Sequence, residues 1–310
     1  MKQVLERVDS WWFERAPAAR LAVVRAAIGG FCLVYLVVRA PNLNGYATFP
    51  AAQFAPLGVV RLLSQPLAPW LVHVLYGLTL LFVFPVIVGF RFRWTAPIFA
   101  ALWCWLMSYR SSWGMIFHTE NLVTLHVLVL AVSAAADTWS IDAKGSTPER
   151  DDGRYGWPLK LMCVVTVLAY VLAGVAKLRN AGWEWVTGDQ LRIHIAYDNL
   201  RKIQLGDIYS PLGAWLVRYQ WLFPPMAWFS LALELGAPLA LVRRRWAAMW
   251  AWGMWAFHAG ILCLMAILFA YPLSGVAFLP FSRAEKILKW PAVARLRTRR
   301  DRMQQTAAAP

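Results

Sequence analysis

Seven long apolar runs dominate the chain. They cover about residues 21–38, 68–90, 95–109, 118–136, 157–176, 224–242 and 246–282. A helix needs ~20 mainly apolar residues to cross the hydrocarbon core of a bilayer. The last run has 37 residues, slightly short for two spans, and Tyr271-Pro272 near its middle favours a break. The pattern predicts an all-α, polytopic transmembrane helical bundle of about eight spans, or seven plus a re-entrant segment.

The composition excludes the main alternatives to a membrane protein. Hydrophobic residues make up 60% of the 310 residues, and charged residues only 15%. A soluble domain carries about 25% charged residues, because its water-facing shell needs them. A soluble enzyme, a disordered chain and a fibrous protein are therefore excluded. The four cysteines lie inside apolar stretches and are expected to be small buried hydrophobic side chains (Cys32, Cys104, Cys163 and Cys263).

The net charge of +15 bears on orientation more than on partners. A basic chain can bind nucleic acid, but in a membrane protein Lys and Arg collect in cytoplasmic loops, so no nucleic-acid partner is expected. Basic residues cluster at the N-terminus, in three loops and in the tail (loops 91–94, 137–156 and 243–245; tail from 283). If all are cytoplasmic, both termini lie inside and the chain needs eight spans. This orientation places the six basic residues of the 177–223 loop outside. The excess of Lys and Arg in cytoplasmic loops holds mainly for short loops, so this long loop does not contradict it.

These assignments divide the chain into three parts. Residues 1–20 form an amphipathic N-terminal segment, in which Trp11, Trp12 and Phe13 stand among basic residues and are expected at the membrane surface. Residues 21–282 form the transmembrane domain, and residues 283–310 a basic cytoplasmic tail. We expect a multi-pass protein of the inner (plasma) membrane, with the bilayer as its first partner. The long outer loops 39–67 and 177–223 are expected to fold back and cap the bundle.

Ionisable residues inside spans are costly, so each needs a partner or a function. Arg25, Glu234 and His258 are expected to give polar support within the membrane, with Glu234 paired to Arg25 or joined by His258. A structural clasp between helices is the alternative. His118 and His126 lie on one helix face at a spacing of i, i+8. His126 is a candidate ligand-binding residue or a core histidine bonded to a neighbouring helix.

Tyr170, Gly174 and Lys177 share one face of the fifth predicted helix. Gly174 would let another backbone or a flat ligand approach closely. Lys177 falls at the outer membrane boundary, where it is either a snorkelling lysine or a partly desolvated amine. Since burial disfavours the ammonium form, such an amine can act as a general base near neutral pH. No metal-ligand spacing, phosphate-binding loop, nucleophile elbow or dinucleotide fingerprint occurs, and no metal is expected.

The segment Tyr-Val-Leu-Ala-Gly-Val-Ala-Lys-Leu-Arg-Asn-Ala-Gly-Trp-Glu-Trp-Val-Thr-Gly, residues 170–188, resembles the signature of the HTTM family. This family is the membrane module shared with vitamin K-dependent gamma-glutamyl carboxylase. Two further blocks agree in order: His118 followed by Trp-Ser-Ile-Asp at 139–142, and Glu234 followed by His258. The resemblance covers about residues 15–282.

The resemblance implies a chemistry and a site. In the carboxylase, a lysine in this block deprotonates reduced vitamin K, whose oxygenation drives carbon-acid chemistry on glutamate, and an earlier histidine assists. The matching residues are Lys177 and His118, which would be catalytic on the outer side. The cofactor would be a reduced quinone of vitamin K or menaquinol type. The residues expected to bind quinol or substrate are Tyr170, Gly174, Trp183, Trp185 and His126.

The chain departs from the carboxylase pattern in two ways. The carboxylase has two adjacent lysines where this chain has Ala176 and Lys177. The large luminal domain of the carboxylase is not expected after residue 282, so docking of a propeptide as in the animal enzyme is not expected either.

Three functions remain open at this point. The first is a quinol-dependent, carboxylase-like enzyme of the bacterial inner membrane, a carbon–carbon lyase acting on an outer-face peptide or small carbon acid. The second is a non-catalytic accessory protein for maturation of, or immunity to, a secreted peptide. The third is a transporter or channel, which is disfavoured because the chain shows no repeat halves and no paired broken helices.

Overall fold

The computed structural model describes residues 2–114, 120–143 and 151–289, and every regular element in these ranges is a helix. Apart from one isolated bridge between Ala16 and Asp152, no extended pairing occurs there. The prediction of an all-α fold is confirmed. The α-helices are α1 (Lys2–Trp12), α2 (Ala18–Val38), α3 (Ala40–Gly45), α4 (Pro69–Val88), α5 (Phe92–Arg110), α6 (Asn121–Ala131), α7 (Gly153–Ala181), α8 (Trp183–Val186), α9 (Asp189–Gln204), α10 (Pro211–Leu216), α11 (Phe223–Leu235), α12 (Arg244–Met265) and α13 (Ala270–Leu273). The 3-10 turns are η1 (Tyr46–Thr48), η2 (Ala51–Gln53), η3 (Gly58–Leu62), η5 (Gln220–Leu222), η6 (Ala237–Leu241), η7 (Val276–Phe281) and η8 (Ala284–Lys289).

Four helices in these ranges are long and apolar enough to cross a bilayer: α2, α4, α7 and α12. The other predicted spans also form helices, but α6 has 11 residues and α11 has 13, both short of the ~20 required. The structure therefore supports a multi-pass membrane protein. The count of about eight spans, and the placement of both termini in the cytoplasm, stay predictions.

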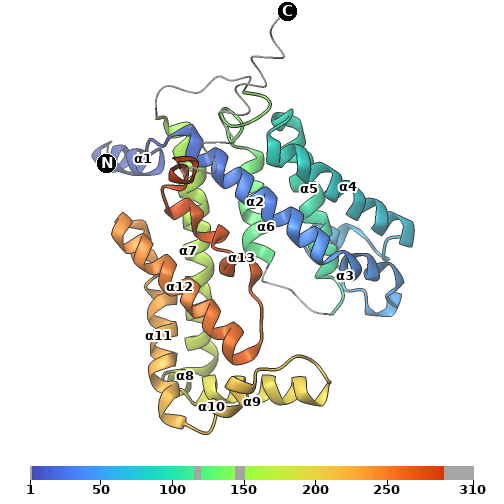
Figure 1. Ribbon diagram of the computed structural model, residues 1–310, viewed down its shortest axis with the longest axis vertical. Coiled ribbons are helices and arrows are strands. Elements are labelled where there is room, and N and C mark those ends of the chain that lie inside the picture. The colour runs from blue at the N-terminus through green and yellow to red at the C-terminus, as the bar shows by residue number, and fades with distance from the viewer. Residues whose placement is uncertain (1, 115–119, 144–150, 290–310) are drawn as a thin grey trace, which may run out of the picture.

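The last apolar run is interrupted, but earlier than Tyr271-Pro272. Helix α12 ends at Met265, Ala266 adopts a left-handed conformation with φ 49°, and the chain turns back toward α13 and η7 (Figure 1). Tyr271 and Pro272 both lie inside α13. At this earlier break, two side chains of α9 and that of Ser210, which precedes α10, bind the last carbonyls of α12, as described below.

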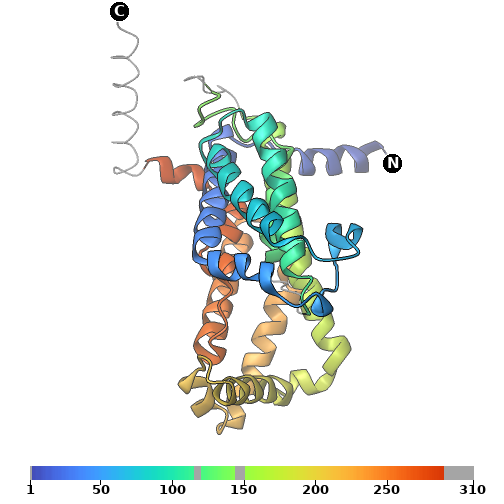
Figure 2. The ribbon, with the colours of Figure 1, turned by 90° about the vertical axis from the view of Figure 1, so that its right-hand side faces the viewer.

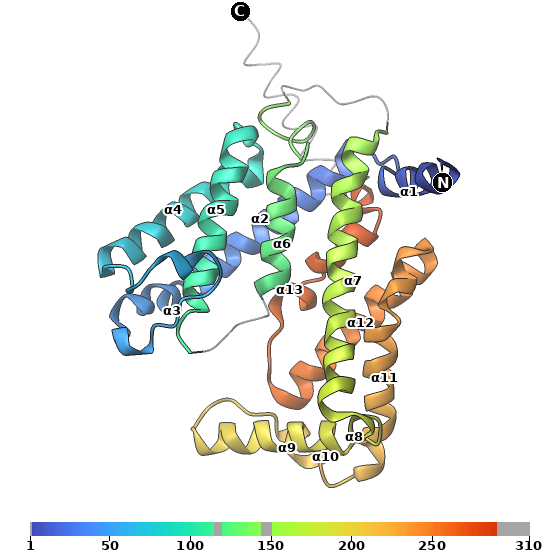
Figure 3. The same ribbon diagram turned by 180° about the vertical axis from the view of Figure 1, so that it is seen from behind.

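Helix α7 is the central element of the bundle (Figures 1 and 3). It packs against α6 and α2 on one side and against α11 and η6 on the other, while α4 packs on α2, and α5 packs between α4 and α6. Trp103, Tyr155 and Tyr271 are among the largest fully buried side chains. This arrangement means that one face of α7 meets several helices in turn.

Short helices lie across both ends of the bundle. Figure 2 shows α9 across one end, and α1 turned across the long axis near the other end. Helix α1 leaves Val4, Leu5 and Val8 exposed. The residues of the predicted 39–67 loop form α3 and η1–η3, and pack on α4 and α5 through a second core cluster that contains Tyr46 and Trp113.

The beginning of α2 and the η8 turn lie together. Arg20 donates two hydrogen bonds, of 2.8 and 3.0 Å, to the carboxylate of Glu285. Burial alone would raise the pKa of Glu285, but the hydrogen bond and charge of Arg20 outweigh it and lower that pKa.

The expectation that all cysteines are buried is wrong for Cys263, which is exposed near the C-terminal end of α12 because that face of the helix has no covering element.

Candidate functional site

A partly buried ion pair joins α7 to α11. The Lys177 ammonium lies 2.7 Å from a carboxylate oxygen of Glu234, and the two side chains are 19% and 4% exposed. Gly174, one turn before Lys177, allows this approach: a Cβ there would lie 3.1 Å from the Glu234 Cβ and 2.9 Å from Leu235 Cδ2. Of the two possibilities for Gly174, the structure therefore shows close approach of a helix, not of a flat ligand.

Two aromatic rings cover the ammonium. Lys177 Nζ lies 4.7 Å from the ring centroid of Trp185 in α8 and 5.2 Å from that of Phe257 in α12. Such contacts stabilise a cation, the more so when water is excluded. Trp185 is held in place by a hydrogen bond of 3.3 Å from its indole nitrogen to the Ser230 hydroxyl. Four helices therefore enclose one lysine head group.

A second polar pair lies on the same face of α7. The hydroxyl of Tyr170 and Nε2 of His258 are 2.9 Å apart, and both side chains are buried. Tyr170 precedes Lys177 by seven residues, about 10 Å along the helix axis. The predicted contact of His258 with Glu234 is wrong. His258 bonds Tyr170, and Lys177 occupies the Glu234 carboxylate.

Arg25 belongs to a different place. It donates to the carbonyls of Ala135 and Trp139 at 2.8 and 2.5 Å, and lies over the ring of Phe92. The predicted pairing of Arg25 with Glu234 is therefore wrong. The carbonyls of the turn that follows α6 bind both terminal nitrogens of the guanidinium, so Arg25 supports that turn and not the lysine site.

His126 is a core residue in the structure, as the second alternative for it expected. It is fully buried, with Nδ1 at 2.7 Å from the Tyr271 hydroxyl and Nε2 at 3.0 Å from the Thr166 hydroxyl. Thr166 is one turn before Tyr170 on α7, so three polar contacts follow one face of this helix. His118, the other predicted catalytic residue, lies outside the described residues.

Two buried polar atoms of the lysine site have no hydrogen-bond partner within the described ranges: Glu234 Oε2 and His258 Nδ1. Buried polar groups are nearly always satisfied, because leaving one unpaired costs about 1–3 kcal/mol. Each atom can still bind a ligand.

An apolar groove of about 500 Å³ lies between α7, α8 and α11, and neither Lys177 nor Glu234 is among the residues that line it. Leu178 and Leu235 of its lining directly follow Lys177 and Glu234 in the chain, and Trp183 and Trp228 form further walls. Trp183 is 76% exposed there, whereas Trp185 points inward over the ammonium. The two predicted tryptophans therefore face different surroundings.

The family model of the HTTM domain matches residues 13–281. The chain belongs to the HTTM family. This confirms the family that residues 170–188 predicted. No curated protein and no solved structure matches the chain.

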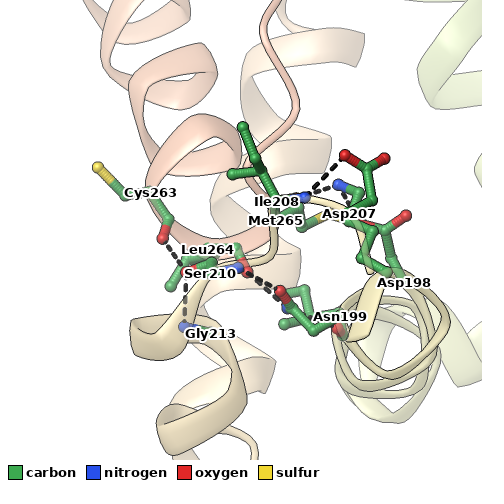
Figure 4. A network of polar contacts seen from close by, with 11 residues as sticks. Asp198, Asn199, Asp207, Ile208, Ser210, Gly213, Cys263, Leu264 and Met265 are labelled. Carbon is green, nitrogen blue, oxygen red and sulfur yellow. Dashed lines mark hydrogen bonds and ion pairs between the residues drawn. The ribbon is translucent and has the colours of Figure 1, made fainter. Parts of the chain in front are cut away.

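In this HTTM protein, a polar network joins the C-terminal end of α12 to α9 and to Ser210 (Figure 4). The amide of Asn199 in α9 donates to the Leu264 carbonyl at 2.9 Å and accepts from the Ser210 backbone N–H at 2.7 Å. The Ser210 hydroxyl and the Lys202 ammonium donate to the carbonyls of Cys263 and Met265. The three last carbonyls of α12 thus gain partners that the helix itself does not provide.

Two residues near the lysine were not predicted from the sequence. Phe257 directly precedes the predicted His258, and the ring centroid of His194 in α9 lies 5.9 Å from that of Trp185. Spacing along one helix identifies residues of a single face, and both of these come from other helices. Among residues 2–114, 120–143 and 151–289, no three metal-ligating side chains come together.

Proposed function

We propose that this HTTM protein is a membrane enzyme that uses a reduced quinone, with Lys177 as general base. The observation that carries the proposal is the partly buried Lys177–Glu234 pair, with the rings of Trp185 and Phe257 over the ammonium. A desolvated amine held by a single carboxylate has the chemistry needed to remove a hydroxyl proton.

The residues present fit a reduced quinone. The 500 Å³ groove offers apolar and aromatic walls to a flat ring and its tail, within the size range of small-molecule sites. Glu234 Oε2 and His258 Nδ1 lie outside the lining of that groove and are unpaired within the described residues, so a ring hydroxyl that reaches the ion pair has an acceptor in Glu234 Oε2. When bound, a reduced quinone supplies an acidic hydroxyl and, with oxygen, the driving force for carbon-acid chemistry.

Proton transfer from Lys177 to Glu234 can generate the neutral amine that acts as the base. Transfer of one proton across the 2.7 Å contact converts the ion pair into a neutral amine and a neutral carboxylic acid. The interior of a protein disfavours ions relative to neutral groups, so this form is accessible there. The neutral amine then accepts the proton of the substrate hydroxyl. Tyr170 positions His258 through their 2.9 Å contact, and we assign the assisting role to His118.

The remaining features of the proposal follow from the family resemblance. The quinone would be of vitamin K or menaquinol type, and the acceptor a secreted peptide or a small carbon acid. The site would face the outer side of a bacterial inner membrane.

Labelling with a photoreactive azidoquinone tests binding without requiring turnover. We expect adducts on the peptides that contain Trp183–Val186 and Leu231–Leu235, and competition by unlabelled menaquinone. Adducts spread evenly over the lipid-facing helices, without competition, would contradict the proposal.

A non-catalytic, accessory role is the second candidate, and one observation favours it. Lys177 and Glu234 satisfy each other and connect α7 to α11, as a purely structural clasp would. Lys177→Ala would then lower the free energy of unfolding in detergent by about 2 kcal/mol or more. An enzymatic role predicts a smaller loss, because functional residues are often neutral or unfavourable for stability.

A further inference from the structure

A long groove follows α12 on the side away from the lysine site. We call it the α12 groove, and it encloses about 880 Å³. One wall is a single face of α12, where Arg244, Ala248, Ala251 and Trp255 recur at i, i+4, i+7 and i+11. The small side chains of Ala248 and Ala251 leave the depression between the larger ones.

The opposite wall comes from the returning chain. Gly275, Phe278 and Leu279 of the η7 region line it, and the Trp255 indole donates to the Leu273 carbonyl at 2.9 Å, which fixes that ring against the returning segment. Trp252 is 71% exposed beside it. The body of the groove is thus apolar.

One end of the groove is strongly basic. Arg244, Arg283 and Lys286 line it there, and none of the three forms an ion pair with a carboxylate of the described chain. The neighbouring carboxylate, Glu285, is bound by Arg20. Three cations without a direct ion pair in the described chain therefore lie at the end of an apolar groove.

The length of the groove matches one leaflet. From Arg244 to Trp255 the helix rises about 16 Å. The hydrocarbon core of a bilayer is ~30 Å thick, so half of it is ~15 Å. A lipid whose head group meets the basic end would place its acyl chain along Ala248, Ala251 and Trp255.

We propose that the α12 groove binds an anionic phospholipid, with the phosphate at Arg244, Arg283 and Lys286 and an acyl chain along α12. Charge complementarity favours this occupant over the two others available. The chain's own tail from residue 290 is itself basic, and a second copy would bring the same three cations. Both would be repelled by the end of the groove that attracts a phosphodiester.

Native mass spectrometry of the full-length protein in detergent tests the head-group site. Phosphatidylglycerol is titrated against phosphatidylcholine with the same acyl chains. The double variant Arg283→Gln/Lys286→Gln should weaken phosphatidylglycerol binding about 25-fold, since each basic residue near an anionic head group adds a factor of about five. The matched control Arg243→Gln/Arg245→Gln removes the same charge from exposed arginines outside the groove and should change binding less than twofold. Equal binding of the two lipids, or equal loss in both variants, would overturn the proposal.

Photo-crosslinking identifies the occupant directly. With p-benzoylphenylalanine in place of Trp252, irradiation in vesicles that contain phosphatidylglycerol should add the mass of that lipid to the protein. A crosslink to the peptide after residue 289 would show that the tail fills the groove, and a crosslinked dimer would show a second copy. Either result would replace the lipid assignment.

Discussion

Lys177 is the residue on which the account depends, and its surroundings allow two functions to be separated. An ion pair with Glu234 needs only a positive charge at this position, whereas a general base needs a side chain that can lose its proton. Arginine provides the first and not the second, because its guanidinium stays protonated in proteins.

Lys177→Arg should therefore leave the free energy of unfolding in detergent within about 1 kcal/mol of the wild-type value, and lower quinol oxygenation by about 100-fold or more. The two readouts are an SDS titration and the yield of oxidised product. If the arginine variant keeps full activity, Lys177 acts only through its charge and the base assignment is wrong.

At the scale of elements, the site depends on how closely α7 and α11 approach. A Cβ added at Gly174 would meet side-chain atoms of α11. A Cβ added at Gly260 in α12 would meet open space. These two helical glycines form a natural matched pair for testing whether the approach matters.

Gly174→Val should lower the free energy of unfolding by about 2 kcal/mol, because the new side chain meets Leu235 and the Glu234 Cβ. It should also separate Lys177 from Glu234 and reduce quinone labelling. Gly260→Val should have little effect on either quantity. Equal effects of the two substitutions would show that helix approach at Gly174 is unimportant.

The connection between α9 and α12 gives a second prediction at this scale. Asn199 is 1% exposed, and its amide binds the Leu264 carbonyl. Asn199→Ala should cost about 1–3 kcal/mol and increase hydrogen exchange at the end of α12, since buried carbonyls lose their donor. Asn42→Ala, at an exposed position, is the control. Unchanged exchange around Leu264 in the Asn199 variant would mean that the network does not fasten this end.

Sequence periodicity predicted the individual faces well and the contacts between helices poorly. The face of Tyr170, Gly174 and Lys177 is a property of one helix, so spacing alone identifies it. The partner of Glu234 was predicted as Arg25 and is Lys177, because pairing depends on which helices the fold brings together. The early end of α12 could not be predicted either, since the side chains that bind its last carbonyls are 53–65 residues away in the sequence.

At the scale of the whole molecule, the two ends carry different features. The α1–η8 end holds the basic cluster of Arg244, Arg283 and Lys286, and the α8–α10 end lies beyond Lys177 (Figure 2). From the charge pattern of the loops, we predict that the first end faces the cytoplasm and the second the outer side.

Single cysteines at Ser10 and at Gly206 test that orientation, in a background without the four native cysteines. A membrane-impermeant maleimide applied to intact spheroplasts should label Gly206→Cys and leave Ser10→Cys unlabelled until the membrane is opened. Labelling at Ser10 in intact spheroplasts would reverse the orientation and place Lys177 near the cytoplasm.

The most direct test of the central claim is the formation of quinone epoxide by the purified protein. It would be incubated with reduced menaquinone or vitamin K, oxygen and bicarbonate, and the product measured by mass spectrometry. Lys160→Ala is the matched control, because Lys160 also lies on α7, 2.7 Å from a carboxylate (Glu14) and 4.7 Å from the ring centroid of a tryptophan (Trp11). We expect epoxide from the wild-type protein and from Lys160→Ala, and none from Lys177→Ala. Equal epoxide from Lys177→Ala, or none from any of the three proteins, would contradict it.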